Sequence, residues 1–264
     1  MADEVEYDKD GHVATLTLNR PDRMNTISGP MLRQLSERLL EADRDRDVRV
    51  IVLTGRGRAF CAGLDLTDAS SGTGIGGGGG GGGFQSLDLR STPPTVLQSI
   101  DTPTICALNG GAAGYGMDIA MLCDMRVAAE SSKLAAAFTK RGIVPESGGT
   151  WVLPRLLGWA KASELIFTGR TLGAKECLEL GLVNKVVSDA SLMDEARALA
   201  EEIAANAPLA VQASKRMMRM GLDEAFDTHV DRVYLQLMPL FRTKDFQEGM
   251  ASFLEKRRPS FEGR

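Results

Sequence analysis

Thr104-Ile-Cys-Ala-Leu-Asn-Gly-Gly-Ala-Ala-Gly-Tyr-Gly116 joins a short apolar run to a cluster of small residues. The run 104–108 lacks polar alternation, which is typical of a strand buried on both faces. A helical pattern follows at 117–123. The first N–H groups of a helix have no partner within it and lie at the positive end of its dipole. We therefore expect this junction to present free N–H donors to a polarised oxygen.

A second junction of the same kind lies earlier in the chain. The apolar run 48–54 leads into Gly55-Arg-Gly-Arg-Ala-Phe-Cys-Ala-Gly-Leu-Asp65. Small residues at Ala62 and Gly63 allow a tight turn and a close approach of the backbone to a ligand. Two such junctions side by side would make an oxyanion hole, although either one alone is better explained as a simple turn. Neither matches G-x-G-x-x-G, which argues against dinucleotide binding.

Working outward, apolar strand patterns alternate with helical ones through most of the chain. The strands are expected at 11–19, 48–54, 104–108, 125–129 and 182–187, and the helices at 28–43, 117–123, 149–157, 160–168 and 174–180. This alternation predicts an α/β fold with parallel pairing. Helical patterns alone follow, at 191–205, 208–220, 222–241 and 243–257. We therefore divide the chain into an α/β core, 1–195, and a helical C-terminal region, 196–264.

The stretch 65–100 has the composition least suited to regular structure. It contains eight consecutive glycines, Gly76–Gly83. Ordering such a run costs much entropy and buries no side chains. We expect a mobile loop here.

Composition excludes several classes of function. The formal net charge of the 264 residues is -4, which argues against a nucleic-acid partner. No apolar run approaches the roughly 20 residues that span a bilayer, and the acidic N-terminus lacks the features of a signal peptide. Four widely spaced cysteines indicate reduced thiols in a cytoplasmic protein. Because there are only two histidines, a zinc site is not expected and acid–base chemistry would fall to Asp or Glu.

Both junctions resemble the oxyanion-hole segments of the crotonase, or enoyl-CoA hydratase/isomerase, family. The matching segments are Ala59–Leu66 and Ala107–Gly116, together with Asn19-Arg-Pro-Asp-Arg-Met-Asn25, Pro145-Glu-Ser-Gly-Gly-Thr-Trp-Val-Leu-Pro-Arg155, Phe167–Leu172, Gly181–Asn184 and Glu248–Arg257. The resemblance covers nearly the whole chain in the right order. It implies a crotonase-like ββα spiral with C-terminal helices that mediate trimerisation, assembled as a homotrimer or as a hexamer built from two trimers.

The resemblance also implies an acyl-coenzyme A substrate, with no metal and no cofactor besides the coenzyme A of the substrate itself. The oxyanion donors would be the backbone amides of Leu64 and Tyr115. The acyl pocket would be lined by Phe138 and Trp151. The coenzyme A contacts would come from Arg23, Met24 and Ala62, and from Phe253 and Lys256 of an adjacent subunit.

The acidic residues separate two reactions. Hydration is best served by two carboxylates that hold one water. One hydratase glutamate of the family corresponds to Asp118, but the other corresponds to Phe138, which cannot transfer a proton. Glu146 stands where several family isomerases carry their proton shuttle, and burial would raise its pKa toward neutrality.

We therefore expect a Δ3,Δ2-enoyl-CoA isomerase-like enzyme with Glu146 as acid and base. The alternative is an enoyl-CoA hydratase that uses Asp118 with Glu146. A remoter alternative is a non-catalytic relative that binds acyl-CoA or RNA. For Glu146 a structural role at a helix start, and for Asp118 a role as a buried hydrogen-bonded residue, stay open.

Overall fold

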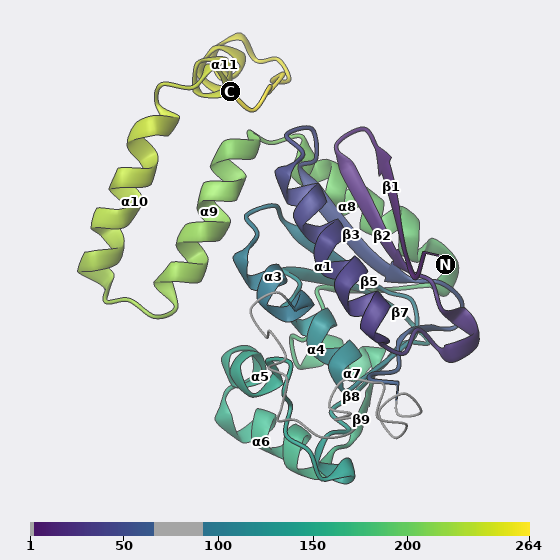
Figure 1. The fold of residues 1–264 in the computed structure, drawn as a ribbon. Helices are drawn as coiled ribbons and strands as arrows, with labels where there is room; N and C mark the ends of the chain where they lie inside the picture. Colours follow the sequence, from purple (N-terminus) through teal and green to yellow (C-terminus); the bar gives the residue numbers. More distant parts are fainter. Residues whose placement is uncertain (1–2, 66–91) are drawn as a thin grey trace, which may run out of the picture.

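The computed structural model describes residues 3–65 and 92–264 and contains a six-stranded sheet (Figure 1). Its strands are β1 (Val5–Asp10), β2 (Val13–Leu18), β3 (Val50–Gly55), β5 (Thr104–Leu108), β7 (Met125–Ala129) and β10 (Lys185–Val187), which lie side by side in that order. β1 pairs with β2 antiparallel, and every later pair is parallel. Parallel neighbours need crossover connections, and these connections supply the rest of the core.

A second sheet has four strands of three residues each. They are β4 (Ala59–Cys61), β6 (Gly111–Ala113), β8 (Lys133–Ala135) and β9 (Thr171–Gly173), again in this order. β4, β6 and β8 follow β3, β5 and β7 along the chain. Each turn of chain therefore adds one strand to each sheet, which is the ββα spiral that the family resemblance implies.

Helices cover both faces of the six-stranded sheet. The helices are α1 (Gly29–Arg44), α3 (Pro93–Ser99), α4 (Tyr115–Leu122), α5 (Gly149–Leu157), α6 (Trp159–Thr168), α7 (Ala174–Glu179), α8 (Leu192–Ala204), α9 (Pro208–Gly221), α10 (Phe226–Leu240) and α11 (Lys244–Glu255), with short 3-10 turns at Pro21–Arg23, Thr139–Arg141 and Asp189–Ser191. The larger core cluster joins one sheet face to α1, α3 and α4. On the other face α8 packs small residues, such as Ala196 and Ala200, against Val50, Ile105 and Val127.

Most predicted elements are present within a few residues of their expected ends. One expectation was wrong: α3 occupies 93–99 in the stretch 65–100 that we expected to be a loop. Its Val96 and Leu97 are buried, so packing stabilises a helix that Pro93 and Pro94 begin. The glycine run Gly76–Gly83 lies outside the described residues. The division at residue 195, which lies within α8, stays a prediction.

The chain leaves the core after α9. Figure 1 shows α10 lying away from the sheets, and none of its residues is buried. In the part of the chain that the structure describes, no helix has the length and hydropathy needed to cross a bilayer.

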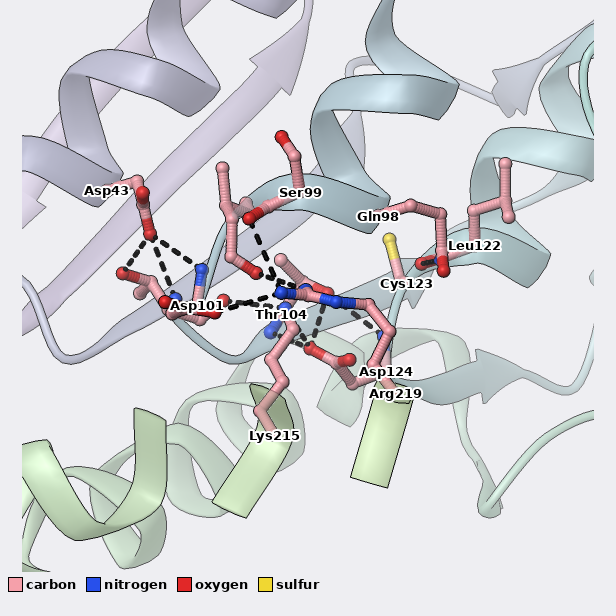
Figure 2. A network of polar contacts seen from close by, with 12 residues as sticks. Asp43, Gln98, Ser99, Asp101, Thr104, Leu122, Cys123, Asp124, Lys215 and Arg219 are labelled. Carbon is pink, nitrogen blue, oxygen red and sulfur yellow. Dashed lines mark hydrogen bonds and ion pairs between the residues drawn. The ribbon is translucent and has the colours of Figure 1, made fainter. Parts of the chain in front are cut away.

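Polar contacts fix α9 to the core (Figure 2). The largely buried Lys215 ammonium donates to the Thr102 carbonyl at 2.9 Å and pairs with Asp124 at 2.8 Å. Asp124 in turn accepts hydrogen bonds from the Thr104 N–H and hydroxyl. One turn further along α9, Arg219 pairs with Asp101 at 3.0 Å. These contacts hold α9 beside the start of β5.

A single arginine joins the beginning and the end of this helical region. The Arg49 guanidinium donates to the carbonyl of Ala204, at the end of α8, at 2.8 Å. It also donates to the carbonyl of Phe261 at 2.6 Å. Beside this contact, the buried Asp245 carboxylate accepts from the N–H groups of Glu262 and Gly263. The C-terminal residues are therefore fastened to the core.

Candidate active site

Leu64 presents a peptide N–H for which residues 3–65 and 92–264 offer no acceptor. It lies just after β4 and forms an isolated parallel bridge with Ile27. In this bridge the Ile27 N–H donates to the Gly63 carbonyl at 2.8 Å, and the Asp65 N–H donates to the Ile27 carbonyl at 3.1 Å. The flanking peptide groups thus face Ile27, and the Leu64 N–H faces the opposite side. It donates no hydrogen bond within the described ranges.

The Tyr115 N–H is also unpaired, for a different reason. Tyr115 is the first residue of α4, so its N–H has no acceptor in the preceding turn. No other acceptor for it exists in residues 3–65 or 92–264. The amide lies at the positive end of the helix dipole, which favours a negative charge in front of it.

Glycines bring these two turns into contact. Gly63 has φ +99, and a Cβ built on it would lie 2.9 Å from the Ala113 carbonyl oxygen and 3.9 Å from the Tyr115 nitrogen. A Cβ on Gly116 would overlap the Cys61 carbonyl oxygen. Only residues without side chains allow this approach. The structure thus places the turns that carry the Leu64 and Tyr115 amides side by side.

A pocket of about 340 Å³ opens beside Tyr115. It brings together three of the predicted site residues, Tyr115, Glu146 and Trp151. The remaining lining residues are Leu32, Thr92, Pro94, Thr95, Gln98, Leu122, Ser147 and Gly148. A larger cavity of about 870 Å³ shares Gln98, Leu122 and Trp151 with it and extends toward α9. The two spaces are therefore neighbours across these side chains.

Glu146 supplies the carboxylate of this pocket. It lies on the loop before α5, directly after the buried Pro145. Desolvation by the surrounding protein raises the pKa of Glu146, and a hydrogen bond from its own backbone partly opposes this. A carboxyl group with a raised pKa is a better proton shuttle near neutrality than an ordinary glutamate.

Asp118 lies close by but does not line the pocket. It is on the first turn of α4 and is 0% exposed. Its Oδ2 accepts from the Ser147 hydroxyl at 2.6 Å and from the Gly149 N–H at 3.0 Å, whereas its Oδ1 has no partner. Burial raises the pKa of Asp118 to about 7, the two hydrogen bonds lower it, and the charge of Glu146 raises it.

Phe138 was expected to line the acyl pocket, whereas Ser147 was not expected to take part in the site. Phe138 is 2% exposed, packs near Gly114 and does not line the pocket. Ser147 was not identified from the sequence, although it lies beside Glu146 in a quoted motif. Its role depends on a contact with Asp118, 29 residues earlier, which no local pattern indicates.

The residues expected to contact coenzyme A form two groups. Arg23, Met24 and Ala62 lie together: the Ala62 N–H donates to the Met24 carbonyl at 3.0 Å, and Arg23 pairs with Asp65 at 3.2 Å. Phe253 and Lys256 lie on or just after α11, and Phe253 is 80% exposed. Figure 1 shows α11 at the opposite end of the molecule from α5. Within one chain the second group is therefore far from the pocket.

The four cysteines are buried and free. In the ranges 3–65 and 92–264, no three His, Cys, Asp or Glu side chains lie close enough together to hold a metal ion.

Comparisons with known proteins identify the family of the chain. Residues 8–264 match the family described as enoyl-CoA hydratase/isomerase. The 1,2-epoxyphenylacetyl-CoA isomerase of Escherichia coli is 40% identical over 96% of this chain and 95% of its own, and the short-chain-enoyl-CoA hydratase of Clostridium acetobutylicum is 35% identical over the same shares.

Among solved structures, the enoyl-CoA hydratase of Bacillus anthracis superposes with a TM-score of 0.89 at 35% identity, covering 99% of this chain and all of the other. The chain is thus an enzyme of the enoyl-CoA hydratase/isomerase family, in the crotonase superfamily.

Proposed function

We propose that this enzyme moves a carbon–carbon double bond in an enoyl-CoA thioester, as a Δ3,Δ2-enoyl-CoA isomerase does, with Glu146 as both base and acid. The observation that carries the proposal is the pocket itself, where Glu146 lies with Tyr115 and Asp118 is shut out. Moving one proton between two carbons needs a single carboxylate, whereas water addition works best with two.

In the proposed reaction the thioester oxygen accepts hydrogen bonds from the Leu64 and Tyr115 amides. These donors stabilise the negative charge that develops on that oxygen. Glu146 takes a proton from the carbon next to the double bond, and the electron pair left behind delocalises into a dienolate. Glu146 then returns the proton at the far end of the dienolate. No water, metal or redox partner takes part, and the carboxylate is regenerated.

Two kinds of support bear on this choice. A relative at 40% identity is named as an isomerase of an acyl-CoA compound, and another at 35% is named as a hydratase. The hydratase alternative, with Asp118 and Glu146 holding one water, is favoured by the pKa of Asp118, about 7, which suits a general acid. It requires the Ser147–Gly149 turn to move so that Asp118 reaches the pocket.

The proposal extends to substrate binding and assembly. Arg23, Met24 and Ala62 would contact coenzyme A of the same chain, and Phe253 and Lys256 would contact coenzyme A bound to a neighbouring copy in a trimer or hexamer. The support is a set of large apolar side chains that α10 and α11 leave exposed, namely Phe226, Val230, Val233, Tyr234, Leu235, Leu237, Phe246, Met250, Phe253 and Leu254. Large apolar side chains left exposed in such number are typical of a protein interface.

The test compares Glu146→Gln with the wild type on two substrates. With a 3-enoyl-CoA the wild type should generate the absorbance of the conjugated 2-enoyl product, and the variant should be slower by about 10²–10⁴. Glu179→Gln is the matched control, because Glu179 is exposed, as Glu146 is, but lies at the end of α7 and does not line the pocket. A near-normal kcat in Glu146→Gln would refute the role of Glu146.

Crotonyl-CoA distinguishes the alternatives. Rapid loss of its conjugated absorbance would mean hydration and would overturn the isomerase proposal. If the wild type turned over neither enoyl-CoA, only the third alternative, a non-catalytic binding protein, would remain.

A further inference from the structure

Asp118 connects the two halves of the proposed active site. On α4 it lies three residues after Tyr115, whose amide is a proposed oxyanion donor. Through Oδ2 it accepts from Ser147, the residue next to Glu146, at 2.6 Å, and from Gly149 at 3.0 Å. One buried carboxylate oxygen therefore ties the helix that carries the oxyanion donor to the turn that carries the base.

The turn is shaped to fit against this carboxylate. Gly148 has φ +108, and a Cβ built on it would lie 3.3 Å from Leu122, one helical turn after Asp118 on the same face of α4. A Cβ on Gly149 would lie 2.5 Å from Asp118 Oδ1. Gly149 is also the first residue of α5, whose N-terminus has no side-chain cap of its own. Asp118, which lies on α4, thus supplies the side-chain cap for the N-terminus of α5.

We propose that Asp118 is a positioning residue, whose carboxylate fixes Glu146 relative to the Tyr115 amide by holding the Ser147–Gly149 turn against α4. It does not touch the substrate, because it is fully buried and lies outside the pocket. This inference rests on the proposed role of Glu146 as the base. It also explains why Asp118 is acidic, although the proposed isomerisation uses only the carboxylate of Glu146.

The ionisation of Asp118 makes the proposal measurable. The titratable groups that interact with it are Glu146, from the loop before α5, and the Tyr115 phenol, whose own pKa is raised by burial. The pKa of Asp118, about 7, lies within the range of activity assays. An ionised carboxylate accepts hydrogen bonds more strongly than a neutral one, so the turn is held best above that pH. We expect kcat of the wild type to rise through pH 7.

The experiment compares Asp118→Asn and Ser147→Ala with the wild type, using the 3-enoyl-CoA assay. Misplacing a catalytic group by a fraction of an ångström is costly, so Asp118→Asn should lower kcat by about 10–100-fold and leave KM within about twofold. Ser147→Ala, which keeps the carboxylate, should cost less. Because both changes break one contact, the double variant should lose less than the product of the single losses. The rise of kcat through pH 7 should disappear in Asp118→Asn.

The matched control is Asp43→Asn. Asp43 likewise accepts from a hydroxyl and a backbone N–H, both of Thr102 at 2.9 Å, but it lies on α1 outside the pocket. It should keep the wild-type kcat and pH profile.

The outcomes separate the two proposals. Full activity in Glu146→Gln refutes the proposed function. If Glu146→Gln is inactive but Asp118→Asn keeps the wild-type kcat and pH profile, the positioning role of Asp118 is refuted and the proposed function stands. A loss in Asp118→Asn that only matches its folded fraction, measured by circular dichroism, also refutes it. If Asp118→Asn does not fold, the decision passes to Ser147→Ala: unchanged kcat there overturns the inference.

Discussion

The two halves of the proposed site, an oxyanion half and an acid–base half, consist of different chemical groups. The oxyanion half consists of peptide groups on two turns that only glycines allow to approach, at Gly63 and Gly116. The acid–base half consists of one side chain, Glu146, on a loop held from behind by Asp118. The first half therefore depends on residues whose side chains are absent, and the second on a side chain whose chemistry is irreplaceable. In the oxyanion half, adding a side chain should therefore lower kcat most, whereas in the acid–base half, removing a carboxylate should.

The largest effect in the oxyanion half should come from Gly63→Ala. The new Cβ would lie 2.9 Å from the Ala113 carbonyl at a φ of +99, so the two turns must separate. Losing one oxyanion donor typically costs about 10²–10³ in kcat, and we expect a loss of that size. Gly111→Ala is the control, since a Cβ there meets no atom within 4 Å. Equal kcat values in the two variants would contradict the oxyanion role.

The buried carboxylate behind the acid–base half should affect stability as well as turnover. The folded-state pKa of Asp118 is about 7, above the value of 3.8 for a free aspartate. Between these two values the folded state holds the proton more tightly, so the contribution of Asp118 to stability is complete below pH 4 and is lost as the pH rises to 7. The loss should be about 2–4 kcal/mol.

Thermal denaturation checks this sign. The melting temperature of Asp118→Asn, taken relative to the wild type, should increase between pH 5 and pH 8. A constant difference across that range would mean that Asp118 does not titrate there.

Trp151 belongs to neither half and should affect substrate choice instead. It is 36% exposed, stacks under the Arg155 guanidinium at 4.0 Å and separates the 340 Å³ pocket from the 870 Å³ cavity. Trp151→Ala should join them and raise the ratio of kcat/KM for a decenoyl over a butenoyl thioester by about tenfold. Trp159→Ala, at a 78% exposed position, is the control. An unchanged ratio would show that acyl chains do not pass Trp151.

The smallest effects should follow changes of the side chains at the oxyanion positions themselves. Because Leu64 and Tyr115 contribute peptide groups, Leu64→Met and Tyr115→Phe should keep kcat within about threefold, a spread typical of peripheral changes. A tenfold loss of kcat in Tyr115→Phe would mean that the Tyr115 hydroxyl takes part in the reaction. The oxyanion half would then not consist of peptide groups alone.

The sequence predicted most of the long elements of the fold, although not β1, because their patterns are local. The apolar runs 48–54 and 104–108 correspond to β3 and β5, and the pattern 149–157 coincides with α5. The second sheet was not predicted, because strands of three residues such as Ala59–Cys61 are too short to show a period.

The site was predictable to a similar extent. Glu146, Tyr115 and Trp151 were expected from the residues and their resemblance, and the structure brings them into one pocket. A buried, hydrogen-bonded Asp118 was one of the alternatives left open, but its partners could not be predicted, since they lie on a turn 29–31 residues away. Long-range contacts of this kind leave no trace in local composition.

The guanidinium of Arg49 has a consequence for assembly. It donates to the carbonyls of Ala204 and Phe261, so the segment that contains α9, α10 and α11 is attached to the core at both of its ends. Attaching both ends lowers the conformational entropy of this segment. The orientation of α10 and α11, with their exposed apolar residues, is therefore restrained relative to the six-stranded sheet. Deleting 258–264 would remove the contact to Phe261, and replacing Arg49 would remove both contacts. Either change should leave the α/β core folded and loosen the orientation of α10 and α11.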